Sequence, residues 1–172
     1  MIKLSLISLA LVTTVSGSVF AAGKAKDAKP AAGKAGECSF EVDGTDAMKF
    51  VDAKGADLKE ISIPEKCRKQ DITFTLKHVG KLPKEAMGHN LVIHDLSKQQ
   101  AIVADGMKAG PAVGYAPATK DGVLGHTDTI GGGAESKIVI AKGSFKDGTN
   151  YGFVCTFPGH SAIMNGKITF AK

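Results

Sequence analysis

From Ser39 onward the chain is a succession of short segments in which apolar and polar residues alternate, or in which β-branched and aromatic residues dominate. Gly, Pro, Asp and Asn residues separate these segments, which is typical of strands joined by turns. Six segments suit strands, at 38–42, 71–76, 90–94, 136–140, 151–155 and 166–170. Six or more short strands in about 135 residues predict an all-β fold, in the form of an antiparallel sandwich.

One segment breaks this pattern. Residues 97–108 contain better helix formers than their surroundings and begin with Ser97, a residue type that favours helix N-termini. We expect one short helix here, inserted between two strands. The sequence shows no internal repeat and no Gly-rich phosphate loop, and beyond the N-terminal leader it offers no apolar run long enough to span a membrane.

The N-terminal residues differ from the rest of the chain. Lys3 precedes a largely apolar run at 4–12, and small residues follow up to Ala21, which is typical of a secretory signal peptide. A membrane anchor would need roughly 20 uninterrupted apolar residues, but Thr, Ser and Gly residues at 13–18 interrupt this run early. We therefore expect residues 1–21 to be removed during export to the periplasm.

Residues 22–36 are rich in Ala, Lys and Gly and contain no large apolar side chain, so burial cannot offset their ordering entropy. We expect a flexible tether here, followed by one folded domain at 37–172. When Lys3, the four tether lysines and Asp27 are set aside, 17 basic and 16 acidic residues remain. This near balance, with Arg68 as the only arginine, argues against a nucleic-acid-binding surface.

Three cysteines in an exported chain suggest one disulfide and one remaining thiol. Pairing Cys38 with Cys67 would close a loop of about 30 residues, worth roughly 3–4 kcal/mol in the chain-entropy model. Cys155 would then be the odd thiol. A free thiol without a function is prone to unwanted oxidation in an oxidising compartment, so we expect Cys155 to have a function.

Cys155 opens the segment CTFPGHSAIM, in which a thiolate, the imidazole of His160 and the thioether of Met164 lie within about ten residues. The Pro-Gly pair between them lets the chain turn back, so that all three donors can face one point. His89, at the start of another predicted strand, supplies a second imidazole. Two His and one Cys with a distant axial Met form the ligand set of blue-copper electron-transfer sites.

Other interpretations of these residues are available. A lone cysteine is usually a small buried hydrophobe, and Met164 taken alone would more often belong to the core. Zinc also binds Cys and His, but its usual ligand sets do not include a thioether, so Met164 favours copper. Isolated histidines are found at His78, His94 and His126, and we expect each to have a core or surface role.

Two other functional classes compete with an electron carrier. In a multicopper oxidase or a nitrite reductase, histidines next to the cysteine reach a second copper, whereas Cys155 has Val154 and Thr156 as neighbours. A copper chaperone or store would be expected to carry exposed clusters of Cys or Met, and the sequence contains none. Both alternatives are therefore less favoured than a carrier.

The two ligand segments, CTFPGHSAIMNG at 155–166 and LPKEAMGHN at 82–90, resemble the azurins, a bacterial branch of the cupredoxin family. The resemblance runs from Cys38 to the C-terminus. It implies an eight-stranded Greek-key β-sandwich with one short inserted helix, a disulfide between Cys38 and Cys67, and one type 1 copper ion. The implied metal ligands are His89, Cys155, His160 and Met164, with the backbone carbonyl of Gly88 as a weak axial contact.

The resemblance also implies roles around the metal. Asn90 would tie the two ligand-bearing loops together, and the backbone N–H groups of Asn90 and Phe157 would point at the sulfur of Cys155. An apolar patch around the edge of His160 would form the electron-transfer surface, made of Leu82, Met87, Met107, Phe157, Pro158 and Ala162.

The implied protein is a monomeric electron carrier and not an enzyme, with redox partners such as a c-type cytochrome or a periplasmic reductase. Two features depart from the azurin pattern: Leu91, where some azurins have a buried tryptophan, and the tether at 22–36.

Overall fold

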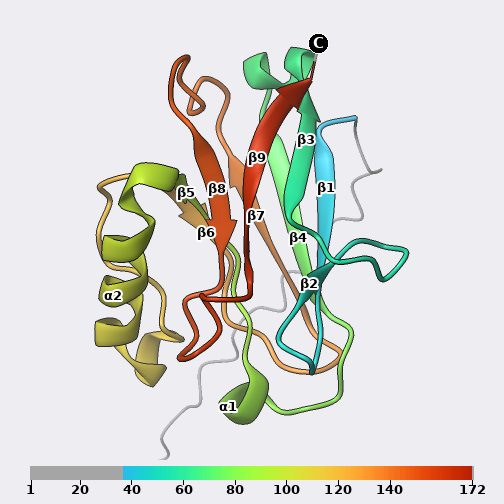
Figure 1. Cartoon of the computed structure of the whole chain (residues 1–172), viewed down its shortest axis with the longest axis vertical. Helices are drawn as coiled ribbons and strands as arrows, with labels where there is room; N and C mark the ends of the chain where they lie inside the picture. Colours follow the sequence, from blue (N-terminus) through green and yellow to red (C-terminus); the bar gives the residue numbers. More distant parts are fainter. Residues whose placement is uncertain (1–36, 172) are drawn as a thin grey trace, which may run out of the picture. The chain divides into compact units, whose positions relative to one another are not determined.

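The computed structural model describes residues 37–171. The predicted signal peptide at 1–21 and the predicted tether at 22–36 lie outside the described residues. Nine strands form two sheets (Figure 1). They are β1 (Ser39–Gly44), β2 (Phe50–Val51), β3 (Glu60–Pro64), β4 (Ile72–His78), β5 (Val92–Asp95), β6 (Val123–His126), β7 (Glu135–Ile140), β8 (Tyr151–Val154) and β9 (Asn165–Ala171).

The first sheet has the strand order β2-β1-β4-β7, and the second has the order β3-β9-β8-β5-β6. This arrangement confirms the predicted all-β sandwich, with nine strands in the described part in place of the expected eight. Five of the seven strand pairings in the described residues are antiparallel as expected, whereas β1 pairs with β4 and β3 pairs with β9 in parallel. Between β1 and β4 the chain passes through β3 in the other sheet, and this crossover supplies the long connection that parallel neighbours need.

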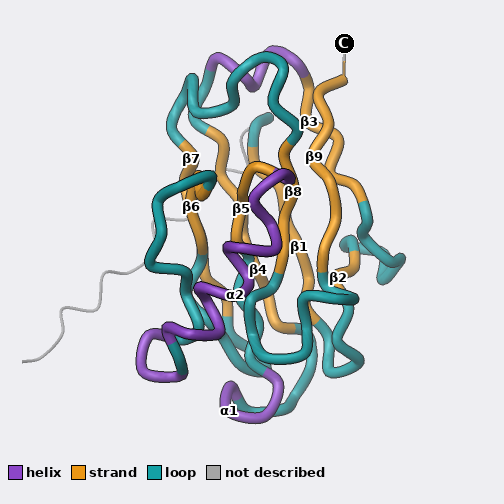
Figure 2. The backbone as a smooth tube through the Cα atoms, turned by 60° about the vertical axis from the view of Figure 1, so that its left-hand side comes forward, coloured by secondary structure: helices purple, strands orange, loops and turns teal. Residues whose placement is uncertain are grey.

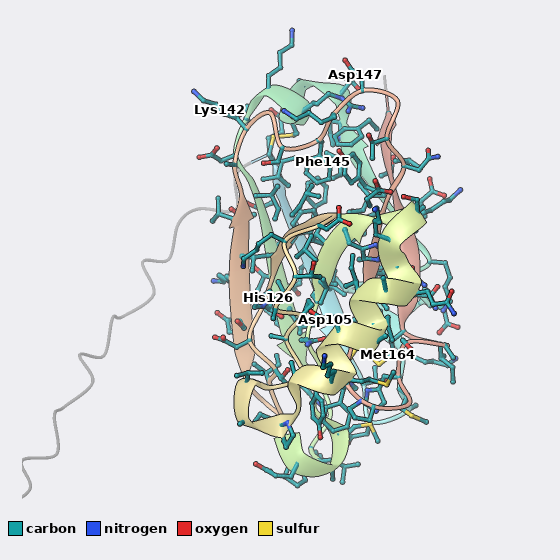
Figure 3. The ribbon with its side chains drawn as sticks, turned by 90° about the vertical axis from the view of Figure 1, so that its left-hand side faces the viewer. Asp105, His126, Lys142, Phe145, Asp147 and Met164 are labelled. Atoms are coloured by element: carbon teal, nitrogen blue, oxygen red, sulfur yellow. A yellow bond between two sulfur atoms is a disulfide. The ribbon has the colours of Figure 1, made fainter. Side chains whose placement is uncertain are left out.

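The core lies between the two sheets. In β4 every second residue is buried, from Ile72 to His78, so one face of this strand packs inward. All four residues of β8 are buried, which places this strand inside the second sheet. The main core cluster contains both Phe145 and Met164, which lie toward opposite ends of the domain (Figure 3).

The predicted helix is present between β5 and β6 as α2 (Gln99–Ala109), preceded by the 3-10 helix η2 (Leu96–Lys98). The capping group is not Ser97: the carboxylate of Asp95 accepts hydrogen bonds from the Ser97 N–H at 2.9 Å and the Ser97 hydroxyl at 2.8 Å. Ile102 on α2 packs with Val92 and Val154 in a second, smaller cluster. Figure 2 shows α2 lying across the sheet beside β5 and β8.

The remaining elements are short: α1 (Lys84–Met87) and the 3-10 helices η1 (Glu65–Lys69) and η3 (Pro111–Val113). A disulfide joins Cys38, just before β1, to Cys67 in η1. Cys155 is a free cysteine and is buried directly after β8. Within residues 37–171, no helix has the length and apolar character required to cross a membrane.

Candidate metal centre

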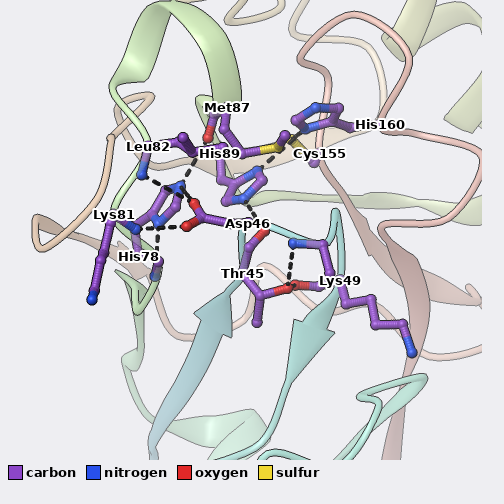
Figure 4. A network of polar contacts seen from close by, with 12 residues as sticks. Thr45, Asp46, Lys49, His78, Lys81, Leu82, Met87, His89, Cys155 and His160 are labelled. Carbon is purple, nitrogen blue, oxygen red and sulfur yellow. Dashed lines mark hydrogen bonds and ion pairs between the residues drawn. The ribbon is translucent and has the colours of Figure 1, made fainter.

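Three buried side chains, those of His89, Cys155 and His160, each place one donor atom within 4.8 Å of the other two (Figure 4). The Nδ1 atoms of the two histidines lie 3.2 Å apart, and the Cys155 Sγ lies 3.8 Å from Nδ1 of His160. His89 stands just before β5, and Cys155 and His160 lie between β8 and β9. The fold therefore brings together three of the four predicted side-chain ligands at the distances a single ion requires.

The orientation of the His89 ring is fixed by groups outside the cluster. Its Nε2–H donates to the backbone carbonyl oxygen of Thr45 at 2.9 Å, so the hydrogen of the neutral ring sits on Nε2. Nδ1 is then left with a lone pair facing Cys155 and His160, which is the tautomer a metal ligand needs. A Cβ on Gly44 would lie 2.6 Å from this ring, so only glycine leaves room for it.

The segment from Cys155 to Met164 is held by backbone hydrogen bonds. The Cys155 N–H donates to the Met164 carbonyl at 2.9 Å, and the Met164 N–H donates to the His160 carbonyl at 2.8 Å. Gly159 has a φ of 81°, the left-handed conformation that allows the predicted turn. Met164 is fully buried and belongs to the same core cluster as Cys155. The fourth predicted ligand is thus tied to the cysteine through the main chain.

The electrostatics of the cluster favour a cation among these donors. Burial raises the pKa of the Cys155 thiol to about 11, opposed by hydrogen bonds to its sulfur from the backbone N–H groups of Asn90 and Phe157. Burial also lowers the pKa of His89 to about 4 and lowers the pKa of His160. Both imidazoles are therefore held neutral with free lone pairs, and a buried thiolate needs a cation beside it. This soft donor set fits copper.

Residues 36–171 match the family of copper binding proteins described as the plastocyanin/azurin family. The chain belongs to this family. An azurin from Alcaligenes faecalis is 40% identical over 131 residues, which cover 76% of this chain and 96% of that protein. An azurin from Pseudomonas aeruginosa is 37% identical over 135 residues, 78% of this chain and 86% of that protein. These similarities confirm the resemblance to the azurins and the assignment of copper as the cofactor.

A further relative is named outer membrane protein H.8, from Neisseria gonorrhoeae. It is 40% identical over 135 residues, which cover 78% of this chain and 68% of that protein.

His78 supports His89 from behind in this family member. The two rings stack with their centroids 4.5 Å apart. The Nε2–H of His78 donates to the Met87 carbonyl at 2.8 Å, and Nδ1 accepts from the Gly80 N–H at 3.1 Å. Both ring nitrogens of this buried residue are therefore satisfied, and its role is in the core, packed against a candidate ligand.

The other two isolated histidines lie away from this cluster. His94 is buried on β5, where its Nδ1–H donates to the Asp95 carbonyl at 2.9 Å and its Nε2 has no hydrogen-bond partner. His126 is half-buried on β6, and its Nδ1–H donates to the Thr127 carbonyl at 3.1 Å.

The residues predicted to form the apolar patch divide into two groups by exposure. Leu82, Met107, Pro158 and Ala162 are exposed, whereas Met87 and Phe157 are half-buried. The Phe157 ring packs against the His160 ring with centroids 4.7 Å apart. Met107 and Ala162 line one groove of about 630 Å³ between α2 and the ligand loop. Gly88 is buried, and a Cβ there would lie 2.9 Å from the Phe157 ring.

Sequence reasoning missed two supporting groups. One is the Thr45 carbonyl oxygen, which orients His89. The other is Asp46, whose carboxylate accepts from the backbone N–H groups of Lys81 at 2.8 Å and Leu82 at 3.2 Å. Figure 4 shows Asp46 beside His78 and this segment. Asp commonly bonds nearby backbone N–H groups, but a bond to a segment 35 residues away leaves no local pattern in the sequence.

Proposed function

We propose that residues 37–172 form a type 1 (blue) copper domain that transfers single electrons between redox proteins. The buried cluster of one thiol and two imidazoles, in a chain of the plastocyanin/azurin family, carries this proposal. His89, Cys155, His160 and Met164 would hold the ion, with the Gly88 carbonyl as a further weak contact. When bound, copper supplies a one-electron couple between its +1 and +2 states.

The surrounding residues keep the ligands in place during this change. The Thr45 carbonyl and the His78 ring fix the plane of His89. The backbone N–H groups of Asn90 and Phe157 bond the Cys155 sulfur, and such hydrogen bonds tune a reduction potential. Because these partners are main-chain or core groups, the ligands need to rearrange little when an electron arrives.

The carrier is favoured over a copper enzyme by the surroundings of Cys155. Azurins are electron carriers and not enzymes, and the family assignment brings this class to the chain. Val154 is fully buried, and Thr156 is buried and hydrogen-bonded to Asn90. Neither neighbour of Cys155 is a histidine, so neither can lead to a second copper.

The cellular setting belongs to the same proposal. Residues 1–21 form a signal peptide, residues 22–36 form a tether, and the domain acts in the periplasm as a monomer. The disulfide between Cys38 and Cys67 supports an oxidising compartment. A c-type cytochrome or a periplasmic reductase would serve as the redox partner.

The visible spectrum of the copper-loaded protein tests this function. An intense thiolate-to-copper band is expected in the wild type, and Cys155→Ser should remove it while the domain still folds, because a hydroxyl is similar in size but a poor soft ligand. A matched control is the double variant Cys38→Ser/Cys67→Ser, which removes two sulfurs that are not ligands and should retain the band. A blue Cys155→Ser protein, or a colourless copper-loaded wild type, would refute the proposed function.

A further inference from the structure

The exposed apolar side chains of the described residues concentrate around the candidate ligands. Six large apolar side chains are exposed, and four of them lie in segments that contain or flank the ligand loops. Residues 156–165 contain no charged side chain. We define the ligand face as Leu82, Met107, Val113, Phe157, Ala162 and Ile163.

Two hollows on the ligand face are lined in part by the loop that carries His160. One is the groove of about 630 Å³ lined by Met107 and Ala162. The other, of about 230 Å³, is lined by Phe157 and Tyr115, whose rings pack edge to face. Such a contoured apolar surface can receive side chains of a partner.

Lysines border this apolar surface. Lys84 lines the smaller hollow together with Phe157, and Lys59 donates from its Nζ to the Ile163 carbonyl. Lys81 directly precedes Leu82 and Lys108 directly follows Met107. All four lysines are exposed, and within residues 37–171 none has a carboxylate oxygen within 4.0 Å of its Nζ.

Six lysines elsewhere in the described residues form ion pairs with a carboxylate: Lys49–Asp57, Lys66–Glu37, Lys77–Glu41, Lys98–Asp121, Lys137–Glu135 and Lys167–Glu60. The acids near the ligand-face lysines are mostly engaged elsewhere. Asp46 accepts from two backbone N–H groups, Glu60 pairs with Lys167, and Asp105 accepts from the Thr119 N–H. Glu85 lines the smaller hollow beside Lys84. The border of the ligand face therefore carries four ammonium groups that no carboxylate of the described residues within 4.0 Å neutralises.

We propose that the ligand face docks a redox protein whose own electron-transfer edge is bordered by aspartate and glutamate. This inference rests on the proposed function in electron transfer. Exposed charges contribute little to affinity individually, but a field of one sign steers diffusing partners and raises the association rate at low salt. The apolar centre then makes the short-lived contact that brings the partner close to His160.

Small redox probes of opposite charge test the sign of the border. The reduced protein gives one electron to iron(III) in the hexacyanoferrate(III) anion or to cobalt(III) in the tris(phenanthroline)cobalt(III) cation, forming iron(II) or cobalt(II). The triple variant Lys81→Gln/Lys84→Gln/Lys108→Gln should react several-fold more slowly with the anion and faster with the cation at low salt. Both differences should shrink above about 0.1 M salt, where screening is strong.

A matched control removes three unpaired lysines from the opposite end of the domain. Lys142 lies at the far end from Met164, as Figure 3 shows. The same figure shows Phe145 and Asp147 at this end, and Lys146 lies between them in the sequence. Lys69 belongs to η1, and the ion pair between Arg68 of η1 and Asp147, at 3.5 Å, brings η1 to the same end. The variant Lys69→Gln/Lys142→Gln/Lys146→Gln has the same net charge as the first. Equal rate changes in the two triple variants would overturn the inference.

A second measurement does not depend on electron transfer. In the zinc-loaded protein, the redox-inert paramagnetic anion hexacyanochromate(III) should broaden the amide resonances of Leu82, Met107 and Ile163, and the ligand-face variant should lose this broadening. Broadening centred on Lys69, Lys142 and Lys146 would contradict the inference. A wild type without the thiolate-to-copper band would refute the proposed function, whereas anion mapping would still report whether the face is positive.

Discussion

The side chain of Asn90 forms two short hydrogen bonds with Thr156: its amide oxygen accepts from the Thr156 N–H at 2.8 Å, and its amide nitrogen donates to the Thr156 hydroxyl at 2.8 Å. The hydroxyl in turn donates to the Tyr115 carbonyl at 2.6 Å. Asn90 follows His89 and Thr156 follows Cys155, so this pair joins the two segments directly behind the ligands.

Replacing Asn90 by alanine leaves the buried Thr156 N–H without its partner. Each unsatisfied buried group costs about 1–3 kcal/mol, so Asn90→Ala should lower the unfolding free energy of the zinc-loaded protein by at least that amount. Urea denaturation measures this loss. Asn150→Ala, at an exposed position, is the matched control. Equal stability of the two variants would show that the Asn90 bonds contribute nothing to the folded state.

Removing the bridge between Cys38 and Cys67 should destabilise the domain without emptying the site, because neither residue belongs to the proposed ligand set. The chain-entropy model predicts a loss of roughly 3–4 kcal/mol for a loop of this length. Urea unfolding of the wild type and of Cys38→Ser/Cys67→Ser gives the difference, and the visible spectrum checks the copper site. Loss of the blue band below the unfolding transition would contradict this separation.

Met87→Lys should keep the blue spectrum but slow electron self-exchange between two copies of the protein. Met87 is half-buried beside the ligand face, and another ammonium there adds like-charge repulsion and a desolvation cost on contact. NMR line broadening in mixtures of oxidised and reduced protein measures the rate. Val139→Lys adds the same charge at an exposed position on β7 and should leave self-exchange unchanged. Equal rates for the two variants would place the exit route elsewhere.

His94 should make stability depend on pH. Burial lowers its pKa in the folded protein below the ordinary value of 6.5, although the Asp95 carbonyl and charge oppose this shift. As the pH falls, His94 in the unfolded chain therefore takes up a proton at a higher pH than His94 in the folded protein. The stability from neutral His94 is full above about pH 6.5 and falls as the pH drops toward the lower folded-state pKa.

Urea unfolding of the zinc-loaded wild type and of zinc-loaded His94→Asn, at pH values between about 7.5 and 5, measures this effect. This range extends on the order of one pH unit to either side of the ordinary histidine pKa. Asn can keep the donor bond to the Asp95 carbonyl but does not titrate. The variant should lose less stability on acidification than the wild type. Parallel pH profiles for the two proteins would show that His94 does not contribute.

The part of the site that could be predicted from sequence is the local part. Cys155, His160 and Met164 are donors of distinct chemistry within one turn-containing segment, so their spacing alone indicates a metal loop. The Thr45 carbonyl could not be predicted, because every residue has a carbonyl and this one meets His89 only through the fold, 44 positions away.

The same limit applies to the sheets. Alternation along β1 and β4 predicts which face of each strand is buried, but it carries no information about which strand lies alongside or in which direction. The parallel pairing of Ser39 with Thr73 follows from the passage of the chain through the second sheet. The helix at 97–108 was predictable from composition, whereas the capping of η2 by the Asp95 side chain depends on the turn in which Asp95 lies.

Helix α2 is attached to the second sheet through the small cluster of Val92, Ile102 and Val154, separate from the main core. Segments with few buried apolar contacts open locally at lower free energy than the core. The amide hydrogens of α2 should therefore exchange with solvent faster than those of β4 and β8, while both sheets stay folded. Because Met107 lies on this helix, local opening of α2 would change one wall of the ligand face while the two sheets stay folded.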